Sequence, residues 1–163
     1  MSANPHFQGV SSWGEARPLI TFDPVQPNDT AGATLQSLAV FVRDHKMRDV
    51  PVSDRTLEAY YGEFSFTQSR KAGGEARRMA IEVPYGRWPC EARIGVHEAR
   101  TYDLGPEPDP GDIDPRSPAV VTWHDGEMFY LVASDTLDVD VLLRIARSIY
   151  AHPPRTRADT QGG

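Results

Sequence analysis

The clearest pattern of apolar positions lies near the end of the chain. Between residues 138 and 150, apolar side chains recur at i, i+3, i+4, i+7, i+10 and i+11, which predicts one amphipathic helix. Asp135 or Asp138 stands where a residue would cap its start, and Pro153 and Pro154 prevent its extension. We therefore expect one helix, with its apolar stripe packed on a sheet.

Two apolar runs, 119–123 and 127–134, precede this helix and are joined by a His-Asp-Gly turn at 124–126. An Asp-Gly pair between two apolar runs is the strongest short-range signal of a hairpin. Residues 92–104 likewise predict two strands around a turn at 95–98.

The first half of the chain also favours strands. Residues 19–22 form a short strand candidate that Asp23-Pro24 stops, and 79–83 form another that Pro84 ends. Residues 35–43 alternate with both sets of positions apolar, which is typical of an interior strand.

Residues 56–70 admit two interpretations. Apolar residues keep period two on both sides of Gly62, which favours a hairpin. A short helix from Asp54 to Tyr61, capped by Asp54 and ended by Gly62, is the competing interpretation.

A connector at 105–118 holds five prolines and four acidic residues, which excludes helix and central strand there. Its carboxylates raise the question of a cation site, but the calcium-loop motif is not met. We expect a solvated, stiff connector. Its acids are Glu107, Asp109, Asp112 and Asp114.

These elements predict an α+β fold: a single curved antiparallel β-sheet of about six or seven strands with a C-terminal helix packed on it. We expect one domain at 18–151, a loose N-terminal segment at 1–17 and a disordered tail at 152–163.

Composition narrows the class of protein. The net charge of -6 argues against a nucleic-acid-binding face over most of the surface. A single cysteine, Cys90, excludes an intramolecular disulfide. The chain begins with no secretory signal pattern and holds no apolar run long enough for a membrane span, so we expect a cytoplasmic protein.

Candidate catalytic and metal-binding residues are sparse. Cys90 and His97, with carboxylates of the 107–114 loop, form the one enzymatic hypothesis, but no helix N-terminus or glycine-rich elbow precedes the thiol. The five histidines show no metal-ligand spacing, so we expect no metal, no other cofactor and no catalytic residues. They are His6, His45, His97, His124 and His152.

Three motifs in the last third carry a family resemblance: G-x(3)-A-x(2)-Y from Gly95, W-x(2)-G-x(2)-F-x-L from Trp123, and L-x(2)-I-A-x-S-I from Leu142. Over residues 95–150 the chain resembles a small bacterial domain of unknown function found at the C-termini of anti-sigma factors and sporulation-associated proteins. The resemblance implies a half-barrel like that of lipoprotein carriers. The chain differs in its acidic connector and in lacking a membrane helix before the domain.

The aromatic residues concentrate in predicted strands, where most must be core. In a half-barrel some would instead line a groove, and the candidates are Trp88, Trp123, Tyr85 and Phe129. We therefore expect a non-enzymatic module that engages a protein segment or an apolar ligand through the concave face or an edge strand. A small enzyme and a purely structural subunit are the alternatives, and a homo-oligomer is left open.

Overall fold

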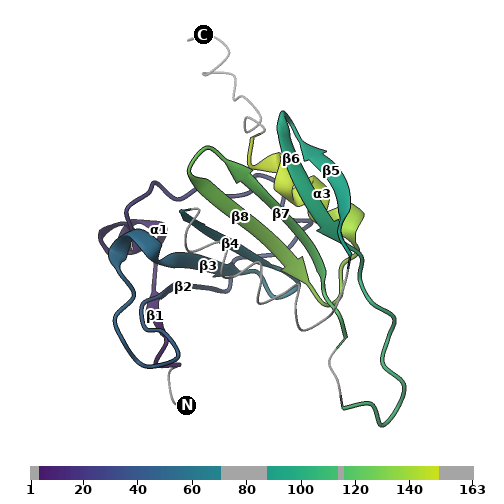
Figure 1. The fold of residues 1–163 in the computed structure, drawn as a ribbon, viewed down its shortest axis with the longest axis horizontal. Coiled ribbons are helices and arrows are strands. Elements are labelled where there is room, and N and C mark those ends of the chain that lie inside the picture. The colour runs from purple at the N-terminus through teal and green to yellow at the C-terminus, as the bar shows by residue number, and fades with distance from the viewer. Residues whose placement is uncertain (1–3, 71–87, 114–115, 151–163) are drawn as a thin grey trace.

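The computed structural model describes residues 4–70, 88–113 and 116–150. This part of the chain forms one eight-stranded, wholly antiparallel sheet (Figure 1). The α+β class with an antiparallel sheet is confirmed, but the strands number eight rather than six or seven. They are Phe7–Val10 (β1), Ser37–Phe41 (β2), Thr56–Tyr60 (β3), Ser65–Arg70 (β4), Cys90–Ile94 (β5), His97–Tyr102 (β6), Ala119–Asp125 (β7) and Met128–Ser134 (β8).

The spatial order β1-β2-β3-β4-β8-β7-β6-β5 divides the sheet into two four-stranded meanders. They meet where β4 pairs with β8, with Phe66 opposite Val132 and Gln68 opposite Tyr130. In Figure 1 β2 and β3 run across the view while β7 and β8 run diagonally, which is the twist expected of a large sheet. The order leaves β1 and β5 as the two edge strands.

The helix predicted near the C-terminus is confirmed as Val139–Ser148 (α3). The Asp138 carboxylate caps its start by accepting hydrogen bonds from the N–H groups of Asp140 and Val141. Leu142 and Ile145 are fully buried where α3 packs on β7 and β8. We call the side of the sheet that carries α3 the helix face and the opposite side the outer face.

Two hairpins of the second meander have the same turn. Gly95-Val96 joins β5 to β6, and Gly126-Glu127 joins β7 to β8. In each, glycine comes first with φ near +60°, as a two-residue II′ turn requires. Strand β7 therefore continues through Asp125, two residues beyond the predicted strand end.

The ambiguous stretch at 56–70 is the hairpin β3–β4, and the competing helix is absent. Preceding it, Val52–Asp54 forms only a 3-10 turn (η2). Strand β2 lies between β1 and β3, which confirms an interior strand within 35–43. The strand expected at 79–83 lies outside the described residues.

Residues 4–17 include regular structure, whereas the sequence suggested a loose segment at 1–17. Phe7–Val10 pairs with β2, and Trp13–Ala16 (α1) forms a short helix capped by Ser12. Strand β1 has only two large apolar residues, and its partner lies some thirty residues further along the chain. Local patterning therefore did not identify it.

The short strand expected at 19–22 does not form. The chain instead makes a 3-10 turn at Arg17–Leu19 (η1), and the Ile20 N–H donates to the Arg17 carbonyl. Pro18 favours this turn because its fixed φ suits the first turn of a helix. Ile20 is still buried, so its apolar character reflects core packing rather than strand pairing.

In the part of the chain that the structure describes, α1, η1 and the following loop cover the helix face of the first meander, and no long helix does. The amide of the buried Gln68 side chain holds that loop: it accepts from the Val25 N–H and donates to the Val25 carbonyl, both at 2.9 Å. Further along the loop, the Asp29 N–H donates to the Ser148 hydroxyl at 2.9 Å. The loop thus connects the first meander to the C-terminal end of α3.

The outer face also differs between the meanders. On β6, β7 and β8 it carries a second, wholly buried apolar cluster of Tyr102, Val120, Phe129 and Leu131. On β3, by contrast, Tyr60 is 45% exposed. The second meander is therefore apolar on both faces near the centre of the sheet.

Candidate functional site

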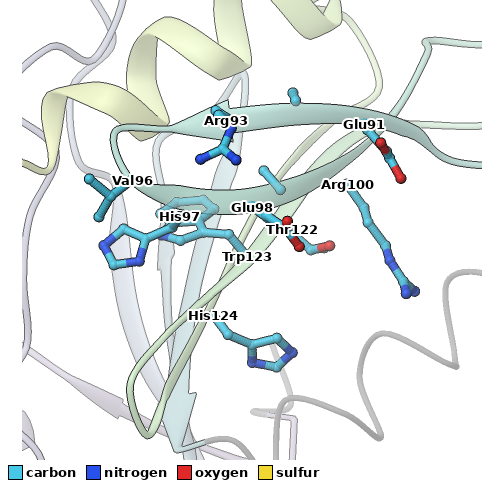
Figure 2. A pocket seen from close by; sticks show the side chains of 11 residues that line it. Glu91, Arg93, Val96, His97, Glu98, Arg100, Thr122, Trp123 and His124 are labelled. Carbon is cyan, nitrogen blue, oxygen red and sulfur yellow. The ribbon is translucent and has the colours of Figure 1, made fainter.

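A cavity of about 830 Å³ opens on β5, β6 and β7 (Figure 2). Figure 2 shows Glu91, Arg100 and His124 extending to the same side of the β5–β6 hairpin. By register, six of the lining side chains belong to the outer face. They are Glu91, Arg93, Glu98, Arg100, Thr122 and His124, and the others are Ala92, Val96, His97, Ala99 and Trp123.

A repeated triplet, Glu-Ala-Arg, supplies the charges of this site, once in β5 and once in β6. The antiparallel register sets Glu91 opposite Arg100, and Arg93 opposite Glu98. All four side chains are exposed. Opposite charges directly across an antiparallel pair stabilise it, so the hairpin carries two complementary pairs on its outer face.

Among the described residues, the edge of β5 presents backbone groups that have no hydrogen-bond partner. In a two-residue hairpin the residues that flank the turn exchange both hydrogen bonds, here Ile94 and His97. Alternation along the strand then directs the backbone groups of Glu91 and Arg93 away from β6. The Arg147 guanidinium donates to the Arg93 carbonyl at 3.1 Å, as this orientation requires. Within the described residues, the outward N–H and C=O of Glu91 have no such partner.

The β1 edge is more occupied. The Phe7 N–H donates to the Asn4 carbonyl at 3.1 Å, and the Ser11 N–H donates to the Glu15 carboxylate at 2.8 Å. By the same alternation only Gly9, between them, turns both backbone groups outward without a partner among the described residues. The strand is also shorter than β5, with four residues against five. Over the described residues, β5 is the longer of the two edges.

A hydrogen-bonded network closes the site next to the hairpin turns. The Trp123 indole N–H donates to the Tyr150 hydroxyl at 2.9 Å, and that hydroxyl donates to Asp125 at 2.9 Å. His97 Nε2 lies 3.5 Å from the same carboxylate, and its ring packs against Tyr150. Partial burial raises the pKa of the Tyr150 phenol, so the group stays protonated and donates to Asp125. The network fixes β6, β7 and the end of α3 to one another.

The predicted groove residues do not gather in one place. Trp123 pairs in register with Tyr130 on the helix face and is 1% exposed, whereas Phe129 pairs with His124 on the outer face and is fully buried. Trp88 is 92% exposed just before β5, and Tyr85 lies outside the described residues. Of the three that the structure describes, only Trp123 lines the cavity.

The residues of the enzymatic hypothesis are also apart. Cys90 begins β5, while His97 pairs with Ile94 at the other end of the hairpin, about 13 Å along the strand at roughly 3.3 Å per residue. In the acidic connector, the Asp112 carboxylate accepts from the Asp109 N–H, and the Asp112 N–H donates to the Asp109 carbonyl, in a local turn. Over the described residues, no three potential ligand side chains cluster as a metal site.

The charged pairs are the feature that sequence reasoning missed. The signal was present, because Glu-Ala-Arg recurs seven residues apart around a glycine turn. Two such triplets in a hairpin with a two-residue turn must face each other with opposite charges aligned.

No protein-family model matches this chain, and no curated protein or solved structure is detectably similar to it. Within 4–70, 88–113 and 116–150, no helix is both long enough and apolar enough to cross a bilayer. The function must therefore be argued from the site.

Proposed function

We propose that this protein is a non-enzymatic binding module that takes up an extended segment of a protein along the edge of β5. The observation that carries the proposal is the outward backbone of Glu91 and Arg93 beside a cavity of about 830 Å³. A strand added to a sheet edge gains affinity from main-chain hydrogen bonds and specificity from alternate side chains. Here the alternate side chains of the edge are a glutamate and an arginine.

The chemistry of the cavity favours a charged polypeptide over an apolar ligand. Both acids and both arginines of the two triplets line it, together with His124. An acyl chain placed against these groups would remove charges from water without offering them hydrogen bonds in return, which is costly. A polypeptide with alternating acidic and basic side chains would pair with them instead.

The same geometry gives less support to a small enzyme. A nucleophile needs its base within hydrogen-bond reach, about 3 Å, whereas Cys90 and His97 lie at opposite ends of β5–β6. His97 is engaged with Asp125 and Tyr150, and these contacts account for its position without a catalytic role.

Edge-blocking variants test the proposal. Glu91→Pro removes one outward N–H and no bond to β6, a replacement that edge strands tolerate. We expect it to weaken binding of fluorescein-labelled peptides with alternating glutamate and arginine at least about tenfold in fluorescence anisotropy, equivalent to about 1.4 kcal/mol. Glu91→Gln, which keeps the N–H, separates the loss of charge from the loss of the donor.

Gly9→Pro is the matched control, because it removes the outward N–H at the centre of the β1 edge, where an added Cβ meets nothing within 4 Å. Peptide binding should survive this change. If Glu91→Pro binds the peptides as wild type does, or if neither wild type nor control binds any of them, the proposal fails.

A further inference from the structure

The open edge of β5 is complementary to itself. We propose that the segment taken up there is β5 of a second copy of this chain, paired antiparallel about a two-fold axis at Ala92. Glu91 of each copy then lies opposite Arg93 of the other, and the two Ala92 residues face each other. This inference rests on the proposed function, since it names the occupant of the same edge. A two-fold interface requires a surface that matches itself, and this triplet does so.

The protein already contains this pairing once. In the β5–β6 hairpin, Glu-Ala-Arg of one strand lies antiparallel to Glu-Ala-Arg of the other, with Glu91 opposite Arg100 and Ala92 opposite Ala99. A second copy would present the same triplet to the other side of β5. The side-chain pairs would be the same, although here they would fall at hydrogen-bonded rather than non-hydrogen-bonded positions.

The backbone restricts the register. Only odd-numbered residues of β5 direct their N–H and C=O groups outward, so odd residues must pair with odd residues. Centring the axis on Glu91 would oppose two glutamates, and centring it on Arg93 would oppose two arginines; both arrangements are unfavourable. Centring it on Ala92 opposes glutamate to arginine twice. Charge therefore selects one register of the three.

Pairing in this register extends an existing charge pattern. On the outer face, each row would run across four strands as Glu98, Arg93, then the second copy's Glu91 and Arg100. Neighbouring strands lie about 4.8 Å apart, so each charge would lie beside an opposite charge on the next strand of the row. On the helix face the matching row is four alanines, whose small side chains let the two copies approach each other closely.

Two features keep this association weak. A strand pair of five residues is a small interface, below the roughly 1,200 Å² of stable complexes. The Arg147 guanidinium also donates to the Arg93 carbonyl, an acceptor that the second copy would use. We therefore expect dimers that depend on concentration, and tighter dimers when Arg147→Ala frees that carbonyl.

Sedimentation velocity over a roughly hundredfold range of concentration measures the association, because mass action governs it. Glu91→Arg and Arg93→Glu should each weaken the dimer at least about tenfold, since each opposes like charges twice. Mixing the two variants should restore it: the first carries two arginines and the second two glutamates, so every pair in a mixed dimer is attractive. Circular dichroism confirms that both variants remain folded.

Engineered disulfides test the register of the proposed β5–β5 pairing. Ala92→Cys, on a Cys90→Ser background, would face itself at a non-hydrogen-bonded position, where Cα atoms lie about 4.5 Å apart and within disulfide range. It should form a covalent dimer under mild oxidation. Arg93→Cys on the same background faces residue 91 and should not, nor should Val96→Cys, which is 83% exposed at the hairpin turn.

Three results would overturn the inference: a monomer at every concentration, a dimer unaffected by both charge reversals, or cross-linking as fast through Val96→Cys as through Ala92→Cys. A monomer that still binds the alternating peptides in a manner lost in Glu91→Pro would overturn the second copy as occupant while leaving the proposed function intact. A monomer that binds none of them would overturn both.

Discussion

The two meanders cover their helix faces with different kinds of structure. The second meander covers its helix face with one ten-residue helix whose Leu142, Ile145 and Ala146 are fully buried. The first covers the same face with a four-residue helix, a 3-10 turn and a loop held by a buried glutamine. The edges differ as well: the first meander caps part of β1 with its own chain, whereas within 4–70, 88–113 and 116–150 nothing caps Glu91 of β5.

In the second meander, the helix-covered core provides stability and the edge hairpin carries the proposed binding site. A regular helix over β7 and β8 gives the second meander a rigid apolar core. That core includes Ile94 and Ala99 of the β5–β6 hairpin, and it supports the exposed, charged side chains on the hairpin's outer face. In the first meander the polar contacts serve mainly to hold the covering loop, and little free edge is left for a partner.

The largest effect should come from the helix. Leu142→Ala removes a fully buried side chain between α3 and the sheet, and we expect a loss of about 2–5 kcal/mol in the free energy of unfolding in urea. Leu143→Ala, on the same helix but only half-buried, should cost clearly less. A loss under about 0.5 kcal/mol for Leu142→Ala, within the surface range, would show that α3 is not part of the core.

The first meander should respond to loss of a hydrogen bond rather than of apolar volume. Gln68→Ala leaves the Val25 N–H and carbonyl without partners, and we expect a cost of about 1–3 kcal/mol. Hydrogen exchange at the Val25 amide should accelerate more than at β8, because the loop detaches first. The exposed Gln36→Ala is the control. Equal acceleration in both meanders would mean that the loop is not a separate unit.

The smallest effect concerns alkaline pH. Burial raises the pKa of Tyr61 in the first meander and of Tyr130 and Tyr150 in the second above the ordinary value of 10.0. The folded state therefore holds these protons more tightly than the unfolded state. Their contribution to stability is complete below about pH 10 and is lost as pH rises through the folded pKa.

Tyr150 has the largest shift of the three, so Tyr150→Phe should flatten the fall of unfolding free energy between about pH 9 and 11 more than Tyr61→Phe does. Chemical denaturation at each pH measures the slope, and any constant loss from the missing bond to Asp125 leaves the slope unchanged. An unaltered slope in Tyr150→Phe would place the titrating group elsewhere.

Much of the fold could be predicted because its signals are local. Glycine turns fixed the hairpins at 92–104 and 119–134, and helical spacing with Asp138 fixed α3. Strand β1 could not be found this way, since its pairing with β2 is a long-range event. The strand predicted at 19–22 was wrong. Ile20 is buried, as its apolar character indicates, but burial does not require strand pairing.

The site was less predictable for a geometric reason. Trp123 and Phe129 both belong to the β7–β8 hairpin, but its register places them on opposite faces, so they cannot line one groove. The Glu-Ala-Arg triplets were visible, yet the same triplet at 15–17 lies mostly in α1. Only the strand order, which sets β5 at an edge, gives the triplet at 91–93 a possible partner.

The contact between Asp29 and Ser148 has a consequence for how the chain reaches this structure. These residues are 119 positions apart, so their hydrogen bond forms only after both meanders and α3 are in place. Interactions absent from the folding transition state act on the rate of unfolding. We therefore expect the Ser148 hydroxyl to slow the unfolding of the protein more than it speeds its folding.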